Sequence, residues 1–201
     1  MREISWKYYT SYQVYSSIED GVGEVIEKNG YGEEVADTIL NLYDYIINNK
    51  WIGACHAISA LLYIALKELG YNVVIKTGEC KLEGELPFDH SWIEIDEKII
   101  DLAIFMPLDE NMGKYGSLNI CGTDVLTMAP HKVLYGINTG MSFNKETDKV
   151  VKTSLSKYMS SFPAEKDGLW TVLNKIYPYD DELNFDLLKL KYDCVFRDLI
   201  R

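Results

Sequence analysis

The chain has 201 residues, of which 47% are hydrophobic and 12% are aromatic, enough to bury a substantial core in a single domain spanning residues 1–201. The formal net charge of −11 argues against a nucleic-acid partner, because phosphate binding needs clustered Lys and Arg side chains. The sequence has no apolar stretch of the length of a signal peptide or a membrane span. It therefore predicts a cytoplasmic protein without a membrane partner.

The first half of the chain contains two predicted helices. Residues 33–47 place their apolar side chains on one stripe and their polar side chains on the opposite face, which is typical of an amphipathic helix. A second apolar stripe predicts a helix from about Cys55 to Leu69. Gly70 stands where a C-terminal cap is expected.

The middle of the chain changes to the pattern of strands. Residues 71–79, 88–96 and 98–105 are short, rich in β-branched residues or alternating, and they predict three consecutive strands. Helices followed by strands indicate the α+β class. A catalytic core is expected over about residues 45–140.

The later part of the chain has weaker patterns. Residues 106–124 are expected to form glycine-containing loops, followed by short strands near residues 124–129 and 131–138. Helical spacing returns at residues 144–162 and 181–200, and these segments are expected to form a helical flank over about residues 141–201. We assign no chemistry to this flank.

Cysteine usage points to free thiols. The four cysteines, Cys55, Cys80, Cys121 and Cys194, are far apart and form no CxxC pair. Neither a zinc site nor a disulfide framework is predicted, and no metal or cofactor is expected.

Cys55 is a candidate nucleophile because it begins a predicted helix. Unsatisfied N–H groups and the positive end of the helix dipole favour a thiolate there. Gly53 and Ala54 leave little side-chain bulk beside the sulfur. The alternative is a small buried core residue, since Cys55 lies three residues before Ile58 on the apolar stripe.

A thiol nucleophile needs a base, and the chain has three histidines. His56 follows Cys55 directly, and adjacent helical side chains point about 100° apart, so it is expected to be poorly placed. His90 lies on a strand where alternation puts it on the face opposite Ile93 and Ile95. A solvent-facing strand histidine is the alternative reading of His90, and His131 is the reserve candidate.

Asp101 is the candidate for orienting the imidazole. A tight turn at residues 96–97 would place Ile95 opposite Lys98 and make Asp101 the diagonal neighbour of His90. A register slip of one residue would move Asp101 to the other face. An aspartate that protects a sheet edge is the alternative.

These residues resemble the core of the transglutaminase-like superfamily, in its compact bacterial type. That pattern combines a Cys flanked by small residues, an H-[AS]-W-x-E strand and an Asp on the next strand, here "GACHAIS", "HSWIEID" and "KIIDLAI". The match covers about residues 51–105. It implies a papain-like fold, in which the Cys-bearing helix packs on an antiparallel sheet. It also implies that Cys55 is the nucleophile, His90 the general base and acid, and Asp101 the orienting group.

Three further residues are candidates around this triad. The oxyanion hole should combine the Cys55 N–H with an upstream donor, for which Asn49 and Trp51 are both open. Asn49 is equally consistent with an asparagine that ends a helix. Trp92 is expected to pack over the triad, although a strand aromatic is also typical of a core.

The triad predicts acyl transfer through a thioester, foremost the hydrolysis of a peptide or other amide by a cysteine protease or hydrolase. Transfer to an amine, as in transglutaminase or acetyltransferase activity, is the first alternative. A non-catalytic binding or scaffold protein on the same fold is the second. The expected partner is a peptide or amide substrate, and no oligomeric state is predicted.

Overall fold

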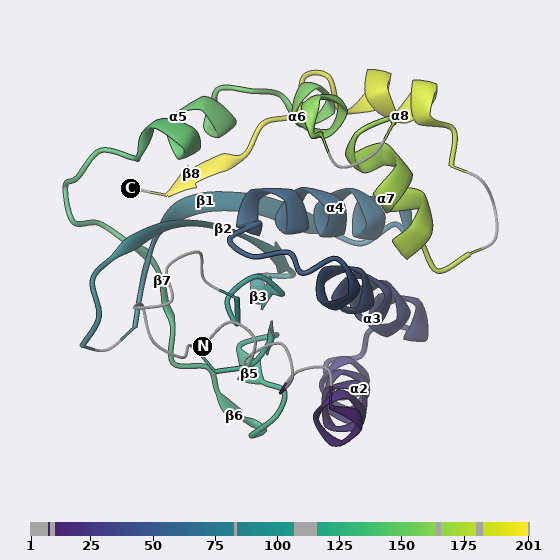
Figure 1. The fold of residues 1–201 in the computed structure, drawn as a ribbon, viewed down its shortest axis with the longest axis vertical. Coiled ribbons are helices and arrows are strands. Elements are labelled where there is room, and N and C mark those ends of the chain that lie inside the picture. The colour runs from purple at the N-terminus through teal and green to yellow at the C-terminus, as the bar shows by residue number, and fades with distance from the viewer. Residues whose placement is uncertain are drawn as a thin grey trace.

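The computed structural model describes residues 8, 11–82, 84–106, 116–163, 166–179 and 183–200. These residues form seven helices and one curled sheet (Figure 1). The α+β class predicted from the sequence is therefore confirmed. None of the described helices is both long enough and apolar enough to cross a membrane.

Helix α4 (Cys55–Glu68) lies at the centre of the fold. It packs on the sheet on one side and against α3 (Glu33–Asn48) and α7 (Leu169–Ile176) on the other. Residues 57–66 are all buried, because the helix is covered from every side. Helices α3 and α4 confirm the two helices predicted from the sequence, whereas α7 and α2 (Tyr12–Lys28) were not predicted.

Three antiparallel strands form the middle of the sheet. They are β1 (Val73–Lys81), β2 (Phe88–Ile95) and β3 (Lys98–Asp101). All three were predicted, but β3 ends at Asp101 rather than at residue 105. Five shorter strands complete it: β4 (Asn119–Ile120), β5 (Thr123–Asp124), β6 (Ala129–Pro130), β7 (Leu134–Ile137) and β8 (Asp198–Ile200). The order is β6-β5-β4-β3-β2-β1-β7, and β8 pairs in parallel with β1 beside β7.

A two-residue turn joins β2 to β3. Its residues, Asp96 and Glu97, have φ angles of 47° and 67°, as a type I′ hairpin turn requires. Ile95 pairs with Lys98, so the predicted register is confirmed. The hydroxyl of Tyr31 donates to the Ile95 carbonyl at 3.3 Å and holds the turn against the end of α2.

The two faces of β2 belong to different apolar clusters. Ile93 and Ile95 join the main core beneath α4. Trp92 belongs to a smaller cluster on the other face, together with Cys80, Ile104 and Val133. The alternation predicted for β2 is therefore confirmed, and His90 lies on the Trp92 face.

The C-terminal part departs from the predicted pair of long helices. The helix expected at residues 144–162 is divided into α5 (Lys145–Val151) and α6 (Leu155–Ser161). The break is stabilised by tertiary contacts, because the Leu155 and Ser156 N–H groups donate to the carbonyls of Val195 and Tyr192 at 2.8 and 3.2 Å. Those two bonds satisfy N–H groups that a continuous helix would have used internally.

The last predicted helix is also wrong over much of its length. Within residues 183–200, only α8 (Phe185–Lys191) is helical, and β8 follows it. Strand β8 forms because the edge of β1 offers free backbone groups to residues 198–200, which overrides their local helical spacing.

Residues 124–129 were expected to be a strand, but 125–128 form a turn between β5 and β6. The carboxylate of Asp124 accepts from the N–H groups of Leu126 and Thr127, which favours the turn. The strand expected at 131–138 is confirmed as β7. The loop expected at 106–124 lies partly outside the described residues, at 107–115, and its described part contains the short strands β4 and β5.

Two glycines of α2 provide a matched test of its packing. A Cβ atom added to Gly21 would lie 2.2 Å from the Val125 carbonyl oxygen, whereas one added to Gly23 would meet nothing within 4 Å. We expect Gly21→Ala to lower the free energy of unfolding by about 1–3 kcal/mol through overpacking. Gly23→Ala should raise it by about 0.5–1 kcal/mol through helix propensity. Urea denaturation measures both, and equal shifts would contradict the packing of α2 against Val125.

Candidate active site

Cys55 is the first residue of α4. Gly53 precedes it with a φ of 62°, and its N–H donates to the Met106 carbonyl at 3.0 Å, which fixes the entry to the helix. The helical bonds begin at Ala57 and Ile58, which both donate to the Ala54 carbonyl at 2.9 Å. The N–H groups of Cys55 itself and of the next residue have no partner among the described residues. Cys55 is half-buried at this end of the helix.

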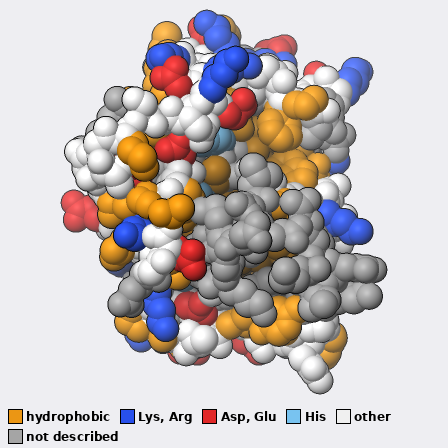
Figure 2. All heavy atoms as spheres, turned by 60° about the vertical axis from the view of Figure 1, so that its left-hand side comes forward, with side chains coloured by type: hydrophobic (Ala, Val, Ile, Leu, Met, Phe, Trp, Pro, Cys, Tyr) orange, Lys and Arg blue, Asp and Glu red, His pale blue; other side chains and the backbone are white. Residues whose placement is uncertain are grey.

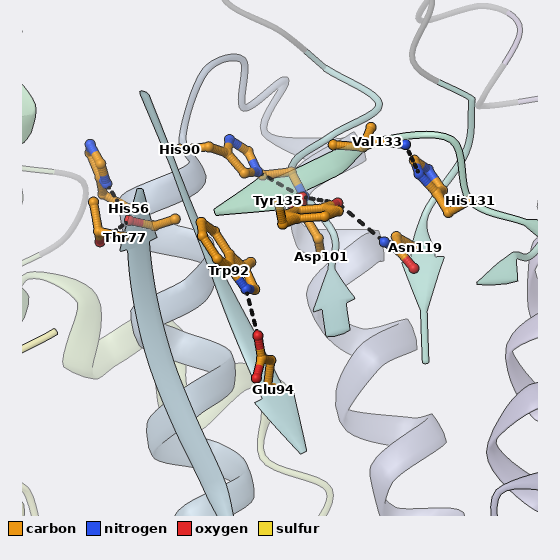
Figure 3. A network of polar contacts seen from close by, with 12 residues as sticks. His56, Thr77, His90, Trp92, Glu94, Asp101, Asn119, His131, Val133 and Tyr135 are labelled. Carbon is orange, nitrogen blue, oxygen red and sulfur yellow. Dashed lines mark hydrogen bonds and ion pairs between the residues drawn. The ribbon is translucent and has the colours of Figure 1, made fainter. Parts of the chain in front are cut away.

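His90 and Asp101 form a buried pair at the ends of β2 and β3 (Figure 3). His90 Nε2 donates to Asp101 Oδ2 at 2.7 Å, and their side chains are only 6% and 1% exposed. The second oxygen, Oδ1, accepts from the Ala103 N–H at 2.8 Å. Because Nε2 is committed to the carboxylate, Nδ1 is the ring nitrogen of His90 that can serve a thiol.

A hydroxyl and an amide extend this pair. Tyr135, from β7, donates its hydroxyl to Asp101 Oδ2 at 2.9 Å, and Asn119 Nδ2 donates to the Tyr135 oxygen at 3.2 Å (Figure 3). Burial and the charge of Asp101 hold the pKa of Tyr135 well above its usual range, so the hydroxyl stays a donor. Sequence reasoning missed both residues, because the position of β7 beside β1 depends on long-range pairing.

The charges of the site favour a thiolate and an imidazolium. Burial alone would raise the pKa of Cys55, but the charges of His56 and His90 hold it well below its ordinary value. Burial alone would lower the pKa of His90, but the charges of Asp101 and Cys55 raise it to about 10. For Asp101, burial is outweighed by the charge and hydrogen bond of His90, which lower its pKa. In all three cases, the pKa shift arises because neighbouring opposite charges stabilise one another.

The ring of His56, in the first turn of α4, contacts two hydroxyl groups. Its Nδ1 is 2.7 Å from the Ser91 hydroxyl and its Nε2 is 3.3 Å from the Thr147 hydroxyl. The charge of His56 contributes to lowering the pKa of Cys55. Both ring nitrogens nevertheless have hydroxyl partners, so His56 is less free than His90 to accept a proton.

The structure also places the remaining candidates. Asn49 Nδ2 donates to the Tyr45 carbonyl at 2.8 Å at the end of α3, as a helix-ending asparagine does. The ring of Trp51 lies 5.0 Å from that of Tyr45 and 5.6 Å from that of Phe162, between α3 and α6. Neither residue takes part in the hydrogen bonds around His90.

Trp92 and His131 lie beside the pair rather than in it. Trp92 is buried, and its ring centroid is 5.2 Å from that of Tyr135, so it supports the residue that binds Asp101. His131 lies in a separate loop network, with Nε2 3.3 Å from the Ser117 carbonyl and Nδ1 accepting from the Val133 N–H. The reserve role of His131 is thus not supported by these contacts.

Comparison with known proteins identifies no relative. No protein-family model, no curated protein and no solved structure matches the chain. Function is therefore inferred below from residue geometry and chemistry alone.

The four cysteines should differ in reactivity. At pH 6 an ordinary thiol of pKa 8.5 is only about 0.3% thiolate. We expect Cys55 to react with iodoacetamide at least about tenfold faster than the exposed Cys194 at this pH, even though a thiolate of low pKa is intrinsically less nucleophilic. Cys80 and Cys121, whose pKa values are raised by burial, should react slowest. Peptide mass mapping measures all four, and equal rates would refute the thiolate.

Asp101→Asn should shift this reactivity to higher pH. The change removes the negative charge that raises the pKa of His90, so His90 loses its proton at lower pH and no longer stabilises the thiolate. The alkylation rate of Cys55 at pH 6 should fall toward that of Cys194. Asp148→Asn, on the surface of α5, is the control and should leave the profile unchanged. An unshifted profile in Asp101→Asn would show that the pair does not act on the thiol.

Proposed function

We propose that the protein is a thiol-dependent acyl-transfer enzyme that hydrolyses peptides or other amides. Cys55 is the nucleophile, His90 the general base and acid, and Asp101 the group that orients the imidazole. The observation that carries this proposal is the buried His90–Asp101 pair. The Nδ1 atom of His90 is not bound to Asp101, and the charge of this ring lowers the pKa of the thiol at the start of α4. Ion pairs with a purely structural role also shift pKa values. Such a role would not explain why a half-buried cysteine stands at the N-terminus of the neighbouring helix.

Attack on the carbonyl is the first step. The Cys55 thiolate adds to the carbonyl carbon of the amide, and negative charge develops on the carbonyl oxygen. The free N–H groups at the start of α4 can receive that oxygen, and the helix dipole favours the same charge. We prefer these donors to Asn49, one of the two upstream candidates, because the Asn49 amide already bonds to Tyr45.

Proton transfer completes the cycle. His90 donates the Nδ1 proton to the leaving amine, and the carbon–nitrogen bond breaks to give a thioester on Cys55. The neutral imidazole then takes a proton from water, whose hydroxide attacks the thioester and releases the acid. Asp101 keeps its charge throughout and holds the ring through Nε2, while Tyr135 and Ala103 stabilise the carboxylate.

A papain-like core of the transglutaminase type is part of this proposal. The support is the chain order of a cysteine helix, a histidine strand and an aspartate strand, with the helix packed on the histidine strand and on β1. Transfer to an amine instead of water uses the same thioester, and the two outcomes differ only in the acceptor.

Removing the nucleophile or the base should abolish turnover. We expect Cys55→Ala and His90→Ala each to lower kcat/KM on an amide library by about 10³-fold or more. Cys194→Ala, at an exposed position, is the control and should keep full activity. A thioester trapped by acid quench and found on the Cys55 peptide would identify the intermediate. Retained activity in Cys55→Ala would refute the mechanism, and added amines that divert the acyl group would indicate transfer.

A further inference from the structure

Arg197 is a buried cation that forms no ion pair with a carboxylate among the described residues. The residue is 4% exposed, in the segment leading into β8. Its Nη2 donates to the His56 carbonyl at 3.0 Å, and its guanidinium lies 4.5 Å from the ring centroid of Tyr158. Its Nε and Nη1 are buried and have no hydrogen-bond partner in the described part of the chain. An arginine held in this way has most of its donors unused.

This arrangement is unfavourable as it stands. A buried charge is normally paired, because desolvation without compensation costs several kcal/mol. The two contacts that exist, a carbonyl and an aromatic face, orient the guanidinium without neutralising it. Burial lowers the pKa of Arg197 to about 10, so it remains protonated at neutral pH. The free nitrogens therefore need an anionic partner.

The position of Arg197 connects it to the thiol. Its partner His56 directly follows Cys55 in the first turn of α4. Burial is the largest influence on the pKa values of Arg197 and Tyr158, and the charge of Cys55 acts to raise both. Figure 2 shows histidine atoms set back among hydrophobic side chains on one face of the molecule. Arg197, Tyr158 and His56 thus lie beside Cys55, on elements that do not carry His90 or Asp101.

We propose that the free nitrogens of Arg197 bind a carboxylate of the acyl donor, so that the substrates of Cys55 are amides or peptides with a negative charge near the scissile carbonyl. Guanidinium and carboxylate groups match in geometry, and a charge-assisted pair is stronger when water is excluded. This inference rests on the proposed role of Cys55 as nucleophile. Arg197 is then the residue that selects the substrate.

Two alkylating reagents of similar size test this selection. Iodoacetate carries a carboxylate where iodoacetamide carries an amide, and both react with the same sulfur. We expect Arg197→Gln to lower the ratio of the iodoacetate rate to the iodoacetamide rate at Cys55 by about fivefold or more. Lys191→Gln is the matched control, because Lys191 pairs with Glu68 at the opposite end of α4 and its loss changes the net charge equally. Its ratio should equal that of the wild type.

The outcomes separate this inference from the proposed function. Slow iodoacetamide reaction at Cys55 in the wild type would remove the nucleophile and with it the premise. Fast reaction with an unchanged ratio in Arg197→Gln would overturn the carboxylate subsite alone. An equal loss of both rates would also overturn it, because Arg197 would then act only on the thiolate.

A measurement on the unmodified protein covers the case in which Arg197→Gln does not fold. At matched ionic strength, succinate should protect Cys55 from iodoacetamide, whereas succinamide, which has the same carbon chain without charge, should not. Equal protection by both compounds, or by neither, would overturn the inference.

Discussion

The contact between His90 and Asp101 is the constraint on which the site depends. A carboxylate with 1% of its side chain exposed is tolerated only when its oxygens are satisfied, and here a ring N–H, a backbone N–H and a hydroxyl all donate to it. These donors come from β2, from the chain just after β3 and from β7. Three separate segments must therefore be correctly placed before the aspartate can be buried, and its burial in turn fixes the plane and the free nitrogen of the imidazole.

Helix α4 brings the thiol to this pair because the rest of the helix cannot move. Its body is buried against β1, β2, α3 and α7, so only its two ends, at Cys55–His56 and Lys67–Glu68, are partly exposed. A closely packed interior allows a helix little movement. The same rigidity holds the first-turn N–H groups where charge on a carbonyl oxygen would need them. Helix α4 thus contributes both to the stability of the fold and to the proposed chemistry.

Local patterns in the sequence predicted the parts of the site that local structure positions. The helix start at Cys55, the face of His90 and the register of Asp101 follow from periodicity and a short turn, and each agrees with the structure. Tyr135 and Arg197 could not be found in this way, because they reach the site through pairing with β1 from more than fifty residues away in the chain. The final strand shows the same effect: residues 198–200 have helical spacing, yet the free edge of β1 decides their conformation.

The position of Asp101 is sensitive to the length of the hairpin turn at Asp96 and Glu97. Because side chains alternate along β3, the number of residues in the turn decides on which side of the sheet Asp101 emerges. Exchange of either turn residue for another that accepts a positive φ leaves that count unchanged. A single inserted or deleted residue reverses it. The placement of Asp101 therefore depends more strictly on the length of this turn than on its composition, as long as both positions accept a positive φ.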